Sequence, residues 1–189
     1  SIQLVFSESV KGKTQDGSGK PIYNDFKKIY DEMLQATTDA EKDKLRTDLA
    51  NALRTHIKLY YRPVSGQPAL VEEKTTTAAD NTNWVIDYRY ATVTLDADSG
   101  EMIVTFPYNK DKPKESAINL SSGVTYYFEL SGIVDTSVAE NAMVGSRGVT
   151  KLPEFTTIDA QLVFMRGTSS GTAADNTTPL VFDMNFRIN

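Results

Sequence analysis

Closely spaced carboxylates in the segment TLDADSGEM are the first residues whose types could do chemistry. Asp96, Asp98 and Glu101 surround the dipeptide Ser99-Gly100. Acidic residues at alternate positions before a glycine are typical of the start of a calcium loop. The residues that follow, MIVTFPY, do not supply the remaining oxygen ligands. The strand-like flanks favour a β-hairpin turn instead, and weak calcium binding is the alternative.

Catalytic chemistry has few candidate residues in this chain. It contains one histidine, His56, and no cysteine, which excludes disulfides, thiol catalysis and cysteine-ligated metals. No G-x-S-x-G turn occurs, and no pair of acidic residues is marked as a glycosidase pair. His56 lies near the end of a predicted helix, where a cation interacts favourably with the helix dipole. We expect no catalytic residue, no metal, no cofactor and no enzymatic activity.

Aromatic residues could bind a ligand without catalysis. The adjacent pairs Tyr60-Tyr61 and Tyr126-Tyr127 must point to opposite faces of a strand, so one tyrosine of each pair should be buried and the other exposed or covered by helices. Exposed Tyr and Trp rings stack on sugars. Four residues are candidates for such a platform: Trp84, Tyr88, Tyr60 and Tyr126. The alternative for Trp84 is that it closes one end of the core.

A six-residue sequence, TAADNT, occurs twice, at 77–82 and at 172–177, each time before an apolar segment. The copies are either two solvated turns of similar composition or the loops of a duplicated hairpin that contact a partner. The second interpretation places the contacts in 75–83 and 168–178. The candidate ligand-binding residues are then Trp84, Thr77, Asp80, Asn81, Asp175 and Asn176.

Strand patterns dominate the rest of the chain. Six segments are rich in β-branched and aromatic residues and are separated by Gly, Ser, Asn and Asp: IQLVFSES, WVIDYRYATVTL, EMIVTFPY, VTYYFELSGIV, IDAQLVFM and LVFDMNFRI. In the second of these, the alternation predicts that Trp84, Ile86, Tyr88 and Tyr90 share one face. Strands at this spacing predict a sandwich or a barrel rather than a parallel α/β sheet.

Residues 21–60 have a helical period instead. Two apolar stripes recur at helical spacing: Ile22, Phe26, Ile29, Tyr30, Met33 and Leu34, then Leu45, Leu49, Ala52, Leu53 and Ile57. Pro21 suits a first helical turn, and Thr38 with Glu41 forms a capping box. We predict an αα-hairpin inserted between strands, with its stripes packed on each other and on a sheet, and with a charged, solvated outer face.

Composition excludes several classes of protein. The 189 residues are 40% apolar and 24% charged, with a net charge of −5, which suits one large domain or one domain with an insertion. There is no basic patch for nucleic acid or for an anionic membrane. No stretch approaches the ~18 apolar residues of a membrane span. Ser1 leads directly into IQLVF, so we expect a mature chain whose leader has been removed.

Four segments in order, IQLVFSESVKG, ATVTLDADSGEMIVTFP, INLSSGVTYYFELSGIVDTSVAENAM and LPEFTT, resemble the bacterial Ig-like domain of the S-layer-protein type. The matching positions are Phe6-Ser7-Glu8, Leu120, Gly123, Tyr126, Gly132, Asp135, Asn141-Ala142-Met143 and Phe155-Thr156-Thr157. The resemblance covers about half of the chain. It departs from the family at Glu140, where a glycine is usual, and in lacking the usual first strand.

The matching residues have structural roles in this interpretation. Gly123 lies in the turn that enters a strand, and Tyr126 takes the place of the corner tyrosine, whose hydroxyl ties the incoming loop to the strand. Asp135 ends its strand because its side chain accepts hydrogen bonds from the following loop.

The resemblance implies a mainly β, Ig-like antiparallel β-sandwich. One domain would span 1–189, with the helical hairpin (21–60) inserted and an extra β-hairpin at 158–189. Such domains are non-catalytic modules of bacterial surface or secreted proteins, in adhesion or structural display. The expected partner is a protein or glycan ligand at the cell surface, with no nucleic acid and no direct membrane insertion. The chain itself is expected to be extracellular or at the cell surface, either anchored to the outer membrane or secreted. The alternatives are a carbohydrate-binding module and a phage or virion assembly subunit.

Overall fold

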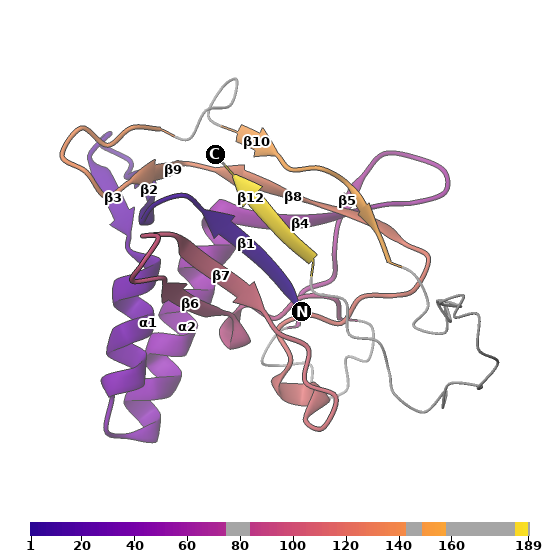
Figure 1. Cartoon of the computed structure of the whole chain (residues 1–189), viewed down its shortest axis with the longest axis horizontal. Helices are drawn as coiled ribbons and strands as arrows, with labels where there is room; N and C mark the ends of the chain where they lie inside the picture. Colours follow the sequence, from indigo (N-terminus) through magenta and orange to yellow (C-terminus); the bar gives the residue numbers. More distant parts are fainter. Residues whose placement is uncertain (75–83, 143–148, 158–183, 189) are drawn as a thin grey trace, which may run out of the picture.

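The computed structural model of the chain describes residues 1–74, 84–142, 149–157 and, as backbone alone, 184–188 (Figure 1). The described part is mainly β, with three sheets and two α-helices. All strand pairs are antiparallel except β1 with β12, which is parallel.

The strands divide among the sheets as follows. The first sheet has the order β12-β1-β7-β6, with β1 at Ile2–Phe6, β6 at Thr92–Leu95, β7 at Met102–Phe106 and β12 at Met184–Ile188. The second has the order β10-β8-β4-β5, with β11 also paired to β8; its strands are β4 (Ile57–Arg62), β5 (Ala69–Leu70), β8 (Thr125–Ser131), β10 (Val149–Lys151) and β11 (Phe155–Thr156). The third has the order β3-β2-β9, with β2 at Val10–Gln15, β3 at Pro21–Asn24 and β9 at Ile133–Asp135.

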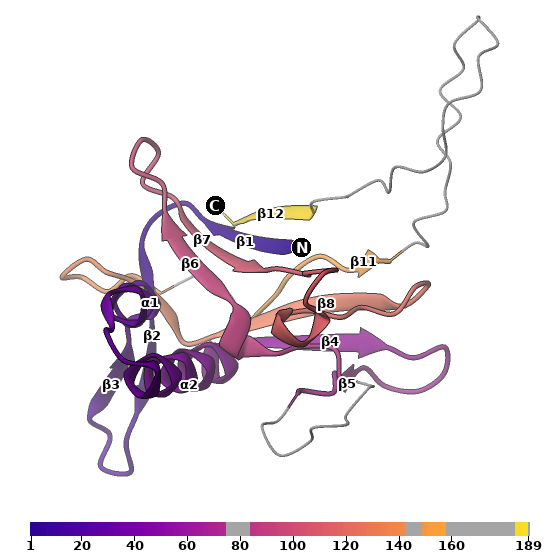
Figure 2. The ribbon, with the colours of Figure 1, turned by 90° about the horizontal axis from the view of Figure 1, so that it is seen from below.

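The core lies between the first and second sheets, which form two layers in Figure 2. Alternate residues of β1 point inward, so that Ile2, Leu4 and Phe6 are all buried. Phe106 of β7 stacks on Phe128 of β8 with ring centroids 5.5 Å apart. This aromatic contact joins the two sheets at the middle of the core.

The predicted helical hairpin is present, with different ends. Helix α1 spans Phe26–Gln35 and α2 spans Asp39–His56. The Thr38 hydroxyl accepts a hydrogen bond from the backbone N–H of Glu41 at 3.2 Å, as predicted for the cap. The helical prediction for 21–25 and 57–60 was wrong, because Pro21 begins β3, which pairs with β2, and Tyr60 lies in β4. Backbone pairing with existing strands overrides the local periodicity there.

The helices pack on each other and on one end of the sheets. Phe26, Leu49 and Leu53 are fully buried, and α1 contacts β6 and β2 while α2 contacts β4 and β8. Leu34 of the predicted stripe is 63% exposed, because the turn that joins the helices extends away from the sheets (Figure 1). The hairpin therefore covers the sheets with one half and projects with the other.

Two long strand predictions were wrong in detail. Of WVIDYRYATVTL only Thr92–Leu95 forms β6, and Tyr88–Tyr90 form a 3₁₀ turn, η1. The Asp87 side chain caps this turn by accepting the N–H of Arg89 at 3.2 Å. VTYYFELSGIV forms two strands, β8 and β9, which belong to different sheets. Gly132 joins them at a φ of 60°, a conformation that suits glycine.

The predicted extra hairpin at 158–189 falls mostly outside the described residues, as does the segment IDAQLVFM. Its described part, β12, pairs with β1. Within the described ranges, no helix is long and apolar enough to cross a membrane.

Candidate functional site

Five of the six predicted ligand-binding residues lie outside the described residues, and both copies of TAADNT lie there too. These five are Thr77, Asp80, Asn81, Asp175 and Asn176. The loop hypothesis therefore stays a prediction. Trp84 is described, and its side chain is only 7% exposed. A ring so covered offers no face to a sugar, which favours the alternative that Trp84 closes the core.

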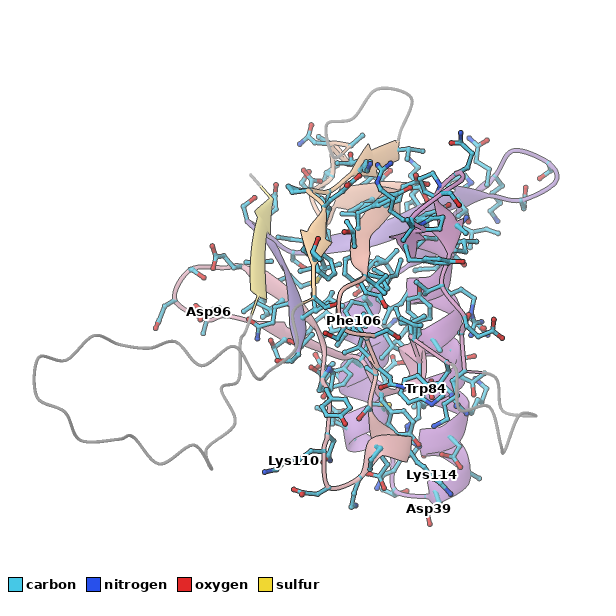
Figure 3. All side chains as sticks on the ribbon, turned by 90° about the vertical axis from the view of Figure 1, so that its right-hand side faces the viewer. Asp39, Trp84, Asp96, Phe106, Lys110 and Lys114 are labelled. Atoms are coloured by element: carbon cyan, nitrogen blue, oxygen red, sulfur yellow. The ribbon has the colours of Figure 1, made fainter. Side chains whose placement is uncertain are left out.

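The surroundings of Trp84 show how it is fixed. The Lys74 ammonium lies over the indole at 4.8 Å from the ring centroid and donates to the Lys114 carbonyl at 2.7 Å. The Asn119 amide donates to the Trp84 carbonyl at 3.2 Å. In Figure 3 Trp84 lies among the packed side chains, while Asp96 and Lys110 extend from the surface. The Lys74–Trp84 contact brings together the two residues that flank segment 75–83.

A buried ion pair lies beside this contact. Asp87 is 1% exposed, and the Arg89 guanidinium binds both of its oxygens, at 2.8 and 2.7 Å. The hydrogen bond to Asp87 raises the pKa of Arg89. The Lys74 ammonium is 3.9 Å from the same carboxylate. A buried carboxylate that is fully compensated in this way has a structural role. We call Lys74, Trp84, Asp87 and Arg89 the Trp84 cluster.

Tyr88 is also closed to ligands. Its side chain is 4% exposed, and its hydroxyl donates to the Ile57 carbonyl at 2.7 Å. Burial raises the pKa of the Tyr88 phenol. Tyr88 therefore joins η1 to β4 and forms no platform.

The outer side of the second sheet is different. Tyr60 of β4 and Tyr127 of β8 are register partners, and their rings stack nearly parallel with centroids 5.2 Å apart. Leu70 of β5 is the partner of Tyr60 on its other side and is 55% exposed. The Lys151 ammonium lies 4.1 Å from the Tyr127 ring centroid. Tyr60 is only partly covered, so this side presents an aromatic and aliphatic surface to solvent.

Ion-paired charges border this surface. The Glu154 carboxylate accepts hydrogen bonds from Arg62 and, at 2.7 Å, from Lys151. These contacts lower the pKa of Glu154 to about 2, and the hydrogen bond from Arg62 has the largest effect. The carboxylate therefore stays charged at any physiological pH. We call Tyr60, Leu70, Tyr127, Lys151 and Glu154, with Arg62, the tyrosine face.

The prediction that one tyrosine of each pair is buried and the other exposed was wrong, because Tyr126 and Tyr127 are both buried and Tyr60 and Tyr61 are both partly covered. The platform assignment of Tyr126 was wrong too. Tyr126 is 2% exposed, and its ring packs on that of Phe155 with the ring centroids 5.9 Å apart. Its hydroxyl accepts the Ser121 N–H at 3.1 Å, as expected of a corner tyrosine. Tyr127 lies on the opposite side of β8, where Tyr60 and Lys151 cover its ring and leave it 6% exposed. Adjacent tyrosines are indistinguishable by type, and only the register with β4 decides which one faces outward.

Asp135 has the predicted capping role. Its Oδ1 accepts the N–H groups of Ser137, at 3.0 Å, and of Asn141, at 3.2 Å. Hydrogen bonds from the side chains of Ser137 and then Asn141 lower the pKa of Asp135. The strand thus ends where a side-chain acceptor folds the next turn.

Glu140 stands in this turn where the resemblance predicts a glycine. Its φ is 50°, in the left-handed region that favours the usual glycine. Its carboxylate accepts hydrogen bonds from Lys11, Lys13 and Tyr23. These bonds lower the pKa of Glu140 to about 2, and the bond from Lys13 has the largest effect. Glu140 has the backbone conformation of a glycine, and its side chain binds residues of β2 and β3.

The hairpin interpretation of TLDADSGEM is confirmed. Strands β6 and β7 pair on either side of it, and Oδ1 of Asp96 accepts the N–H groups of Asp98, at 3.0 Å, and Ser99, at 2.8 Å. Gly100 has a φ of 74°. Over the described ranges, no three His, Cys, Asp or Glu side chains are grouped so as to hold a metal ion.

His56 is a buried residue rather than a charged helix end. It is 1% exposed; Nδ1 lies 2.8 Å from the Ser131 carbonyl and Nε2 lies 3.0 Å from the Asn24 amide nitrogen. Burial lowers its pKa, so the expected cation at the dipole is replaced by a neutral ring. Gly12 and Gly132 make room for it, since a Cβ on Gly12 would lie 2.2 Å from the imidazole. Sequence reasoning missed this junction of α2 with two sheets.

Comparisons with known proteins gave no relative. No family model matches the chain, no curated protein matches it, and no solved structure matches it. The functional assignment therefore rests on the residues themselves.

Proposed function

We propose that the chain is an Ig-like β-sandwich that serves as a non-catalytic binding module of a bacterial cell-surface or secreted protein, in adhesion or display. The two facing sheets, the hydroxyl tie of Tyr126 and the Asp135 cap support the Ig-like assignment. The glycine-like backbone of Glu140 extends that support to the turn at which the family pattern is broken.

The tyrosine face is the observation that supports binding. It combines a partly exposed aromatic ring, an exposed Leu70 and a charged border on one side of a sheet. Strands β4 and β5 hold Tyr60 and Leu70 in fixed positions, so a ligand would not have to order their backbone. An apolar centre with a polar border is the general anatomy of a protein interface.

A carbohydrate ligand is the second candidate, and the Tyr60–Tyr127 stack favours it. The stack keeps the Tyr60 ring in place without covering it fully. The apolar face of a sugar ring can pack on such an aromatic surface, while Arg62 and Glu154 lie within the same face to hydrogen bond hydroxyl groups.

The experiment is a broad glycan array followed by a panel of surface proteins, with the Tyr60→Ala variant. The matched control is Tyr108→Ala, since Tyr108 is 52% exposed and lies outside the tyrosine face. Selective binding that Tyr60→Ala abolishes and Tyr108→Ala retains would support the proposal. Binding that survives Tyr60→Ala would exclude the tyrosine face, and an array without any binding would exclude the carbohydrate candidate.

The loop residues stay a separate proposal. If segment 75–83 and segment 168–178 contact the partner, replacing each with a short Gly-Ser linker should weaken binding. Unchanged binding in both linker variants would exclude Thr77, Asp80, Asn81, Asp175 and Asn176 as ligand contacts.

A further inference from the structure

The pairing of β12 has an unusual form. β12 runs parallel to β1 over five residues, from Ile2 opposite Met184 to Phe6 opposite Ile188. Every other strand pair in the described part of the chain is antiparallel. Among the described residues β1 is the sole strand partner of β12, which forms the edge of its sheet (Figure 2).

Strand β1 depends on this pairing. On its other side it pairs with β7, so without β12 its remaining N–H and C=O groups would form an open edge. With β12 in place its side chains are buried: Leu4 is 0% exposed and Val5 6% exposed. A buried, apolar edge strand with open backbone groups is a template for another strand.

The segment that precedes β12 is long enough for β12 to pair either with β1 of its own molecule or with β1 of a second copy. β11 at Phe155–Thr156 pairs with β8 in the second sheet, whereas β12 lies in the first. Residues 158–183, 26 in number, separate these parts. A chain of that length spans up to roughly 90 Å when fully extended, which is enough to reach a neighbouring molecule. A flexible tether gives β12 an effective concentration on the order of mM at its own β1, so pairing within one molecule is favoured in dilute solution and exchange gains as the protein concentration rises.

We propose that the β1 edge accepts β12 from a second copy of this chain, which gives strand-exchanged oligomers. Exchange retains the whole β1–β12 ladder, because the same five residue pairs form between two molecules as within one. Reciprocal exchange gives a closed dimer, and head-to-tail exchange gives a linear assembly. The inference is independent of the tyrosine face, which lies on the second sheet.

The absence of cysteine from the sequence makes the test simple. Gln3 and Asn185 are register partners, so Gln3→Cys is placed in one preparation and Asn185→Cys in another. The two are unfolded together, refolded at several concentrations, oxidised and separated without reductant. Asp43→Cys, at an exposed position of α2, replaces Asn185→Cys in the control mixture.

We expect a disulfide-linked dimer of Gln3→Cys with Asn185→Cys, increasing with protein concentration and at least tenfold more abundant than in the Asp43→Cys control. The double variant Gln3→Cys/Asn185→Cys measures pairing within one chain. If it links only internally at every concentration, and the mixed single variants do not link, β12 stays in its own molecule and the proposal is wrong. If neither preparation links, β12 does not lie on β1, which also overturns it.

Discussion

The Trp84 cluster and the tyrosine face use the same residue types for opposite purposes. Both combine aromatic rings with a lysine ammonium and a carboxylate–arginine pair. Around Trp84 the ring and the carboxylate are buried, at 7% exposed for Trp84 and 1% for Asp87. On the tyrosine face the ring of Tyr60 and the side chain of Leu70 remain open to solvent. Aromatic content therefore does not tell a buried cluster from an exposed surface; the position of each side chain in the fold does.

The largest expected effect separates the two regions by stability. Trp84→Ala removes a buried indole and should lower the free energy of unfolding by about 3–5 kcal/mol. Tyr60→Ala removes a partly exposed ring and should lower it by much less. Urea unfolding of both variants measures the difference. Equal losses would show that the tyrosine face is part of the core.

A smaller effect separates two neighbouring residues. Tyr126→Phe removes the hydroxyl that accepts the Ser121 N–H and should cost about 1–2 kcal/mol, because a partly buried donor loses its acceptor. Tyr127→Phe, on the other side of β8, should change the unfolding free energy by less than about 0.5 kcal/mol. Similar changes of the unfolding free energy in the two variants would show that the Tyr126 hydroxyl does not stabilise the incoming loop.

The smallest effect is a pH dependence centred on His56. Burial lowers the pKa of the folded-state imidazole below its ordinary value of 6.5, so the unfolded chain binds the proton more tightly. The stability that neutral His56 provides is fully present above pH 6.5 and is lost as pH falls below it. Between pH 7.5 and pH 5.5 the free energy of unfolding should fall by more for the wild type than for His56→Gln, as measured by urea unfolding at both pH values. Identical losses would mean that His56 does not titrate differently in the two states.

Local patterns predicted much of the fold. The Thr38 cap, the TLDADSGEM hairpin and the Asp135 cap depend on short segments and were identified from residue types, and the corner hydroxyl of Tyr126 was expected from the resemblance to Ig-like domains. Where long-range pairing decides, prediction failed. Residues 21–24 look helical but pair with β2, and Trp84 to Tyr90 alternate like a strand but break at η1 because Asp87 caps a turn.

The candidate site was less predictable than the fold. Trp84 was named for its position beside a polar loop, but Lys74 lies over its ring and Asn119, 35 residues away, donates to its carbonyl. The Tyr60–Tyr127 stack was missed because it depends on the register of β8 with β4, which no local pattern contains. The Gly12–His56 contact was missed for the same reason.

The most direct test compares ligand binding by the two aromatic regions. The best ligand from the glycan array or the protein panel is titrated against the wild type, Tyr60→Ala and Trp84→Phe, with folding of each verified by circular dichroism. The account predicts at least a tenfold weaker affinity for Tyr60→Ala and an unchanged affinity for Trp84→Phe. Full affinity of Tyr60→Ala together with a weaker affinity of Trp84→Phe would contradict it and would indicate that the ligand binds beside Trp84.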